Sequence, residues 1–170
     1  EYRNRIICKM TDDYYTQGES VLIIVEKLAH GHNLDQLLHT YKTGAFVPHE
    51  FIHGSTSPEV RKEALENFRK GTNRVLLATR ILDVGIDVPA LSVIMFAASG
   101  KSPIRTLQRL GRGLRTHANK KRLTVVDFCD RTNRHLANHS LERIQTYMDE
   151  AAFTITVQDP PSLDFGGVCK

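Results

Sequence analysis

The segment from Gln108 to Arg115 carries the side chains best suited to binding phosphate. It reads Gln-Arg-Leu-Gly-Arg-Gly-Leu-Arg, and Gln108, Arg112 and Arg115 stand at i, i+4 and i+7, on one face of a helix. Arginine stays charged and can bind phosphate oxygens through two parallel N–H donors, so this row suits a nucleotide triphosphate. A glycine inside a helix costs roughly 1 kcal/mol, so two glycines here indicate close approach by a backbone or a ligand. A solvated basic face is the alternative interpretation.

Histidines and cysteines give no pattern that predicts a metal site. His49 and His53 are four residues apart, but they flank a predicted strand, where four residues span about 13 Å, too far for one zinc ion. The other histidines and the three cysteines form no ligand set either. Cys129 is expected to be a small buried residue beside the last strand. Three cysteines far apart in sequence favour a reducing, cytoplasmic compartment over a disulfide framework.

Composition fits one globular domain. The chain has 170 residues, of which 41% are hydrophobic and 25% charged, enough to bury a core. The net charge of +4 favours a polyanionic partner, and the lack of Trp argues against a base-stacking platform. No apolar run reaches the length of a membrane span and no signal peptide opens the chain, so no membrane partner is expected. Glu1 stands first in place of Met, which suggests a piece of a longer protein.

Alternating strand and helix patterns predict an α/β fold with a parallel, doubly wound sheet and helices on both faces. Short apolar runs rich in β-branched residues predict strands at 21–25, 50–52, 74–79, 91–96 and 123–128. Helical spacing predicts helices at 3–17, through Leu34–Leu38, at 58–70, from Ser102, and at 133–151. Residues 153–157 are expected to add an edge strand.

One domain is expected to cover residues 1–158, with a loose tail at 159–170. Within it, residues 1–17 form a packing helix, 18–130 the motif-bearing core and 133–151 a closing helix. The helix at 58–70 has the clearest boundaries, because Ser57 is an N-cap residue, Pro58 suits the first helical position and Gly71 suits the end.

Unusual polar residues follow the strands of the predicted sheet. In doubly wound sheets, ligands bind at the carboxyl ends of the strands. His53-Gly54-Ser55, residues 79–87 and Gly100-Lys101-Ser102 all stand at such positions, so they are expected to gather on one edge. Gly100-Lys101-Ser102 is not a phosphate-binding P-loop, because the required earlier glycine falls at Met95, inside a strand.

These segments resemble the second RecA-like domain of superfamily 2 helicases and translocases. Gln108–Arg115 is similar to motif VI in the form found in the XPB-like, phage UvsW-like and restriction-translocase branches. Residues 78–89 are similar to motif V, residues 21–31 to motif IV, and His53–Ser55 to the motif that follows it. The resemblance covers roughly residues 18 to 130 in the family's order and implies a RecA-like fold.

The resemblance also implies an ATP site shared between two domains, with ATP and Mg²⁺ as cofactors. Arg112 and Arg115 match the arginine fingers, and Gln108 is placed beside the nucleotide. Gly85 and Asp87 are placed at the ATP ribose and phosphates. The partner is an N-terminal RecA-like domain of the same polypeptide, whose P-loop and acidic box bind most of the Mg²⁺ and are missing from this chain.

For nucleic acid, the resemblance assigns backbone contacts to Ser55, Thr79 and Arg80. Contacts to the sugar-phosphate backbone read charge and not sequence, as a motor moving along any strand requires. Gln108 stands where the DEAD-box branch has His, which favours DNA, whether single-stranded, duplex or branched. The resemblance therefore predicts the C-terminal motor domain of a bacterial or phage ATP-dependent DNA helicase or translocase, acting in repair, recombination or branch migration and inactive when isolated.

Two other functions stay open from the sequence. One is a stand-alone nucleic-acid-binding module that uses the same edge without ATP. The other is an unrelated α/β enzyme, such as a nucleotide-dependent transferase, whose arginine helix binds phosphate. The second is disfavoured, because no nucleophile or general-base pair stands near the predicted edge.

Overall fold

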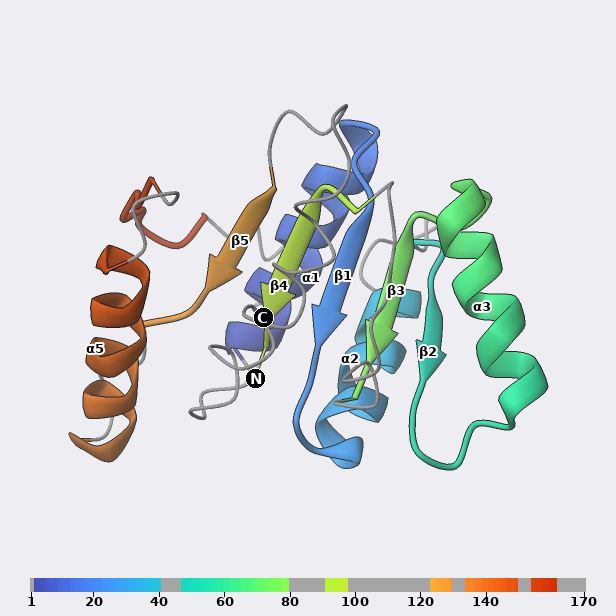
Figure 1. Cartoon of the computed structure of the whole chain (residues 1–170), viewed down its shortest axis with the longest axis horizontal. Helices are drawn as coiled ribbons and strands as arrows, with labels where there is room; N and C mark the ends of the chain where they lie inside the picture. The colour runs from blue at the N-terminus through green and yellow to red at the C-terminus, as the bar shows by residue number, and fades with distance from the viewer. Residues whose placement is uncertain are drawn as a thin grey trace, which may run out of the picture.

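The computed structural model of the chain describes residues 2–40, 47–79, 91–97, 123–129, 134–149 and 154–161. Figure 1 shows strands and helices alternating from α1 to β3, followed by β4, β5 and α5. The strands are β1 (Val21–Ile24), β2 (Glu50–Ile52), β3 (Val75–Ala78), β4 (Val93–Phe96) and β5 (Thr124–Asp127). The helices are α1 (Tyr2–Thr16), α2 (Leu28–Thr40), α3 (Pro58–Lys70) and α5 (Arg134–Met148).

The five strands form one sheet in the order β2-β3-β1-β4-β5, and all the pairs are parallel. β1 is the central strand: Ile23 pairs with Leu77 of β3 on one side and with Met95 of β4 on the other. From β1 the chain goes first to the edge strand β2 and returns to β3, which lies between β2 and β1; β4 and the other edge strand, β5, follow on the opposite side of β1. The prediction of a parallel α/β sheet is confirmed.

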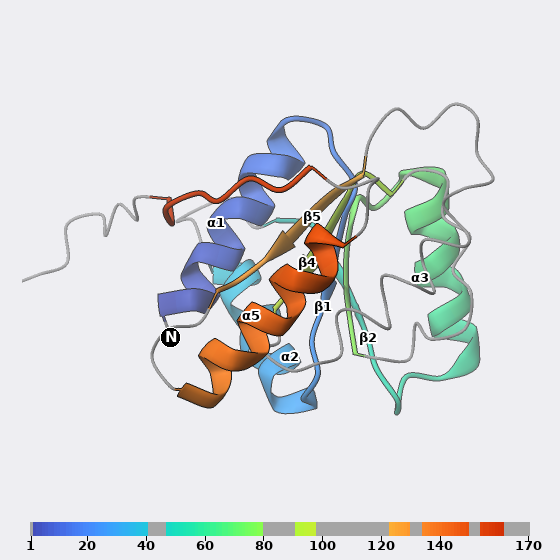
Figure 2. The same ribbon diagram turned by 60° about the vertical axis from the view of Figure 1, so that its left-hand side comes forward.

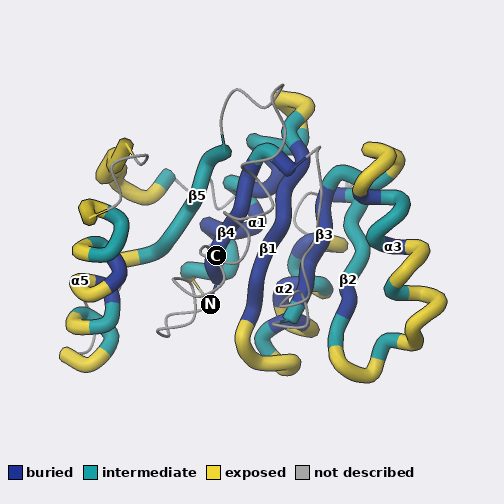
Figure 3. Tube along the Cα trace, in the orientation of Figure 1, coloured by how far each residue is buried: buried dark blue, intermediate teal, exposed yellow. Residues whose placement is uncertain are grey.

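Alternate residues of the central strands face two separate apolar cores. Ile23, Leu77 and Met95 belong to the core that contains residues of α1 and α2, whereas Leu22 and Leu76 face the core that contains Phe68 of α3. Figure 2 shows α1 and α2 on one side of the sheet and α3 on the other. Figure 3 shows why these strands read as continuous apolar runs, since β1, β3 and β4 are buried along their length.

α3 begins and ends as its sequence predicts. The Ser57 hydroxyl accepts a hydrogen bond from the Val60 N–H, and Pro58 occupies the first turn, where its missing N–H costs nothing. Gly71 adopts a left-handed conformation with φ of 72° and donates its N–H to the Phe68 carbonyl. These caps fix the start of α3 directly after the loop that follows β2.

α2 lies close to β2 at one glycine. A Cβ built on Gly31 would overlap the ring of Phe51, with the ring Cε2 only 2.9 Å away. The ring has little freedom to move, because its centroid lies 5.3 Å from the His32 ring and 5.0 Å from the His53 ring. Gly31 is therefore required by packing, and it sets the distance between α2 and β2.

An ion pair between the buried Arg143 and the half-buried Asp127 joins α5 to the end of β5. The Arg143 side chain is 1% exposed, and its Nε lies 2.7 Å from Oδ2 of Asp127. The same guanidinium donates to the Phe128 carbonyl and to the Ser140 hydroxyl. The Tyr147 hydroxyl donates to Asp127 over 2.8 Å, and burial together with this carboxylate raises the pKa of Tyr147 above its ordinary range. These contacts satisfy charges that would be costly to bury unpaired.

Two local predictions are wrong. Cys129 is exposed instead of buried, because it lies beyond the end of β5, where the core has ended. Residues 154–157 form no strand and are exposed. Cys8 is the buried thiol, and burial raises its pKa from 9.0 to about 12.

The other boundaries agree to within three residues, except that α2 begins at Leu28 and already contains His30–Asn33, which were expected to precede the helix. The helix predicted from Ser102 lies outside the described residues. The division into a domain at 1–158 and a tail at 159–170 stays a prediction. Within the described ranges, no helix has both the length and the apolar character needed to cross a membrane.

We expect Gly31→Ala to destabilise the protein although alanine favours helices. The added methyl group overpacks the contact with Phe51, which should lower the free energy of unfolding by about 1–3 kcal/mol. The matched control is Asn33→Ala, an exposed position on the same helix, for which a change within about 0.5 kcal/mol is expected. Urea unfolding measures both variants. A Gly31→Ala protein as stable as the wild type would show that the close approach is not a constraint.

Candidate nucleic-acid interface

Because all five strands are parallel, their carboxyl ends meet at one edge of the sheet (Figure 1). Polar residues follow two neighbouring strands there. β2 is followed by the loop His53–Ser57, and β3 is followed by Thr79. The pairing of Ile52 with Ala78 places these two segments next to each other. The structure thus confirms that part of the predicted edge forms.

Ser55 and Thr79 are the two predicted contact residues that the structure describes. The Thr79 N–H donates to the Ile52 carbonyl over 3.2 Å, which continues the β2–β3 pairing by one step. Ser55 lies three residues after Ile52 and is exposed, while Thr79 is half-buried. The two hydroxyl-bearing residues therefore extend from adjacent strand ends.

Hydrogen bonds within the loop hold its main chain in place. The His53 N–H donates to the Thr56 hydroxyl over 2.9 Å, and the Thr56 N–H donates back to the His53 carbonyl over 3.0 Å. The Ser55 N–H donates to Nδ1 of His53 over 3.3 Å, so the proton of the neutral His53 ring belongs on Nε2. The loop presents Ser55 from a fixed turn.

Arg61 supports the loop from the first turn of α3. Its guanidinium donates to the Thr56 carbonyl over 3.1 Å and to the His53 carbonyl over 3.4 Å. The sequence analysis did not single out this residue. An arginine one turn after an N-cap, in a helix that directly follows a candidate loop, is the signal that would have identified it. The arginine also places a permanent positive charge next to Ser55.

Aromatic contacts fix the other side of the loop. The His53 ring lies 5.7 Å from the His32 ring of α2 and 5.0 Å from the Phe51 ring, measured between centroids. α2, β2 and α3 therefore all contact the loop that carries Ser55. A loop supported by three elements loses little conformational entropy when it binds a ligand.

Six predicted site residues lie outside the described residues. These are the nucleic-acid residue Arg80, the ATP residues Gly85 and Asp87, and the catalytic residues Gln108, Arg112 and Arg115. Their assigned roles stay predictions.

We expect Arg61→Ala to destabilise the loop and the protein. Hydrogen bonds from a charged donor contribute about 1.5–3 kcal/mol, and the truncated side chain leaves two carbonyls without this donor. The free energy of unfolding should fall by about that amount in urea titrations. Arg69→Ala is the matched control, since Arg69 lies on the same helix in an exposed pair with Glu66 and should change stability by at most about 1 kcal/mol. Equal losses in both variants would contradict the supporting role of Arg61.

Comparison with known proteins identifies the family. The model of the helicase conserved C-terminal domain matches residues 3–117. The ATP-dependent DNA helicase UvsW of Enterobacteria phage T4 is 25% identical over 164 residues, covering 87% of this chain and 32% of UvsW. The pre-mRNA-splicing ATP-dependent RNA helicase PRP28 of Debaryomyces hansenii is 30% identical over 93 residues, covering 55% of this chain and 16% of PRP28.

Solved structures agree with the sheet topology. The crystal structure of T4 UvsW has a TM-score of 0.66 at 23% identity and covers 86% of this chain and 32% of that chain. S. cerevisiae Dbp5 bound to RNA and ADP BeF3 has a TM-score of 0.64 at 20% identity, covering 85% of this chain and 36% of that chain. The chain spans a third or less of the length of UvsW and PRP28. It belongs to the helicase conserved C-terminal domain family and has the fold of the second RecA-like domain of superfamily 2 helicases.

Proposed function

We propose that this chain is the C-terminal motor domain of an ATP-dependent DNA helicase or translocase. The observation that carries the proposal is the supported loop at the carboxyl edge of the sheet, which holds Ser55 exposed beside Thr79. An N-terminal P-loop domain of the same polypeptide would complete the motor. The motor would use ATP and Mg²⁺, with Mg²⁺ bound mainly by that N-terminal domain.

Ser55, Thr79 and Arg80 are proposed to contact the sugar-phosphate backbone. Hydroxyl groups and main-chain N–H groups donate to phosphate oxygens whatever the base sequence. The Arg61 charge beside the loop and the net charge of +4 favour a polyanion at this edge. Backbone contact without base readout is what a domain that steps along nucleic acid needs.

DNA is proposed as the nucleic acid. Gln108 stands at the position where the DEAD-box branch has His, and UvsW, described as a DNA helicase, aligns over 87% of this chain. PRP28, described as an RNA helicase, aligns over only 55%. The proposed class therefore includes the branch-migration, repair and recombination motors of phages and bacteria.

Arg112 and Arg115 are proposed as arginine fingers, with Gln108 beside them and with Gly85 and Asp87 at the nucleotide. Arginine fingers reach across the cleft between two domains and stabilise the negative charge that develops on the γ-phosphate in the transition state. The chain itself has no P-loop, because the segment that ends in Gly-Lys-Ser at 100–102 has Met95 where the first glycine is required. It would therefore supply one half of the ATP site.

We expect the isolated chain to bind DNA weakly and without hydrolysing ATP. A labelled single-stranded DNA, its RNA counterpart and a second DNA sequence, titrated at several salt concentrations, test this. Affinity should fall steeply with salt and be similar for the two DNA sequences. Ser55→Ala and Thr79→Ala should each weaken binding, while Thr16→Ala, at an exposed threonine that ends α1, should not.

Three outcomes would contradict this assignment. Sequence-specific binding that persists at high salt would indicate a protein that recognises particular DNA bases, which a motor does not. A clear preference for RNA would contradict the proposal that the domain acts on DNA. ATP turnover by the purified chain that survives a check for contaminating ATPase would reject the half-site.

We expect Arg112→Ala in the full-length protein to reduce DNA-stimulated ATP turnover by about 10³- to 10⁵-fold. Arg112→Lys should restore little, because a flexible ammonium lacks the planar fork of the guanidinium. ATP affinity should change much less than turnover, since fingers act mainly in the transition state. Arg134→Ala, an exposed arginine on α5, is the matched control, and circular dichroism confirms folding. Near-normal turnover in folded Arg112→Ala and Arg115→Ala would refute the finger assignment.

A further inference from the structure

Three potential metal ligands meet where α2 ends and the chain turns into β2. One carboxylate oxygen of Asp35 and one ring nitrogen each of His39 and His49 all lie within 4.8 Å of one another. Asp35 and His39 are at i and i+4, so they share one face of α2, and His49 comes from the residue before β2. We propose that Asp35, His39 and His49 bind one Zn²⁺ ion.

The orientation of His49 is the strongest argument for a cation. Its side chain is fully buried, its Nδ1 lies 2.7 Å from the Val47 carbonyl oxygen, and its Nε2 lies 3.0 Å from Oδ1 of Asp35. In the neutral ring the Nδ1–H donates to the carbonyl, which leaves a lone pair on Nε2 facing a carboxylate oxygen. Two such acceptors at this distance need a proton or a metal ion between them.

The hydrogen bond from His49 to Val47 is the outer-shell contact that metal-binding histidines typically make. Such a contact fixes the tautomer and directs the other ring nitrogen toward the metal. Zinc bonds of about 2.0–2.1 Å in a tetrahedral site place neighbouring ligand atoms roughly 3.3 Å apart. The 3.0 Å separation of Nε2 and Oδ1 is close to this value.

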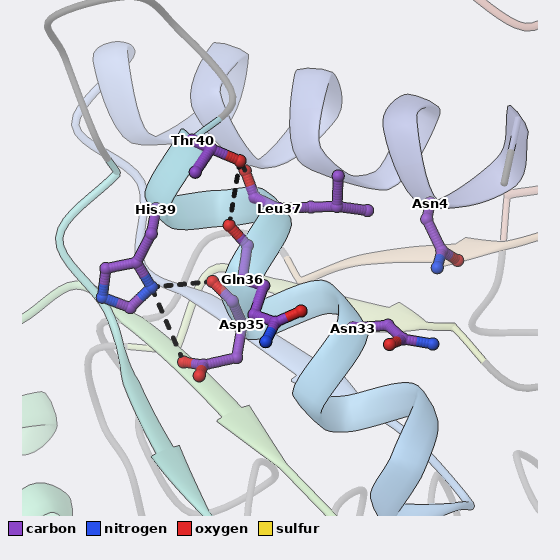
Figure 4. Close-up of a pocket in the computed structure, with 7 residues that line it drawn as sticks. All are labelled: Asn4, Asn33, Asp35, Gln36, Leu37, His39 and Thr40. Carbon is purple, nitrogen blue, oxygen red and sulfur yellow. Dashed lines mark hydrogen bonds and ion pairs between the residues drawn. The ribbon is translucent and has the colours of Figure 1, made fainter.

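His39 can supply the third ligand once its ring turns. Its Nδ1 now donates to the Asp35 carbonyl over 2.7 Å and lies 3.8 Å from Oδ1 of Asp35, and its ring centroid lies 4.6 Å from that of His49. The side chain is 54% exposed, so it can rotate without disturbing the core. Figure 4 shows Asp35 and His39 on the wall of an open pocket that Asn33 and Gln36 also line. His49 does not line this pocket, so an ion would reach the three ligands past the exposed side chain of His39, where water can supply the fourth ligand.

Zinc fits the donor set better than magnesium or calcium. Two imidazoles and one carboxylate are typical ligands of Zn²⁺, whereas Mg²⁺ and Ca²⁺ prefer oxygen ligands alone. The ion would cross-link the last turns of α2 to the residue before β2. This position lies at the amino ends of the strands, whereas Ser55 and Thr79 lie at their carboxyl ends. The proposed site is therefore independent of the nucleic-acid interface.

Zinc binding by the 170-residue chain tests the proposal. Chelator-treated protein is titrated with Zn²⁺ alone in a competition assay against a chromophoric chelator, and melting temperatures are measured with and without Zn²⁺. The wild-type chain should bind one Zn²⁺ and melt at a higher temperature with it, because an ion that binds only the folded state stabilises that state. Co²⁺ in place of Zn²⁺ should give the visible absorption of a four-coordinate site.

His39→Ala is the main variant, because its exposed side chain can be removed without opening the core. Loss of a direct ligand should weaken Zn²⁺ binding by more than the about 10- to 100-fold that outer-shell changes cost, and should abolish the rise in melting temperature. Asp35→Asn should behave alike. His135→Ala, an exposed histidine on α5, is the matched control and should bind as the wild type does.

Two results would overturn the proposal. One is the absence of saturable binding by the wild-type chain, which would identify Asp35 and a protonated His49 as a plain ion pair between α2 and β2. The other is equal binding by His39→Ala and the wild type, which would place any zinc elsewhere.

Discussion

Main-chain pairing around β1 is the constraint on which the other features depend. β1 lies between β3 and β4, hydrogen-bonds to both, and is buried along its whole length. Parallel pairing needs crossover connections, which are right-handed. Because the steps from β1 to β2 and from β2 to β3 run in opposite directions across the sheet, α2 and α3 cover opposite faces. The same pairing brings every strand to its carboxyl end at one edge. The positions of Ser55 and Thr79 follow from this geometry more than from any local preference of the loop.

Patterns within one segment were predictable from the sequence, and side-chain contacts between different segments were not. The continuous apolar run of β1 and the caps of α3 are local signals, and both appear in the structure as expected. The support of the His53 loop by Arg61 and the contact of Gly31 with Phe51 arise only after strands and helices pack. Cys129 was misplaced because a strand pattern does not show where the core ends.

For the candidate interface, sequence placed Ser55 and Thr79 on a common edge, since strand ends in parallel sheets converge. It could not place Asp35 and His39 beside His49, because the separations that matter run from a helix face to the start of a strand. Helical spacing in a sequence predicts only whether ligands on the same helix lie on one face. Ligand sets shared between elements need the register of the fold, which for α2 and β2 is set by the approach of Gly31 to Phe51.

The ion pair between Asp127 and Arg143 also fixes α5 along its own axis. Apolar side chains tolerate a helix sliding by a turn, about 5.4 Å, because one aliphatic contact replaces another. A guanidinium that is 1% exposed does not, since any shift leaves its buried charge without the Asp127 carboxylate. Arg143 therefore fixes the position of α5 along its own axis relative to β5. It also sets a minimum length for the domain, because a chain ending before residue 143 would leave the Asp127 carboxylate without its counter-charge.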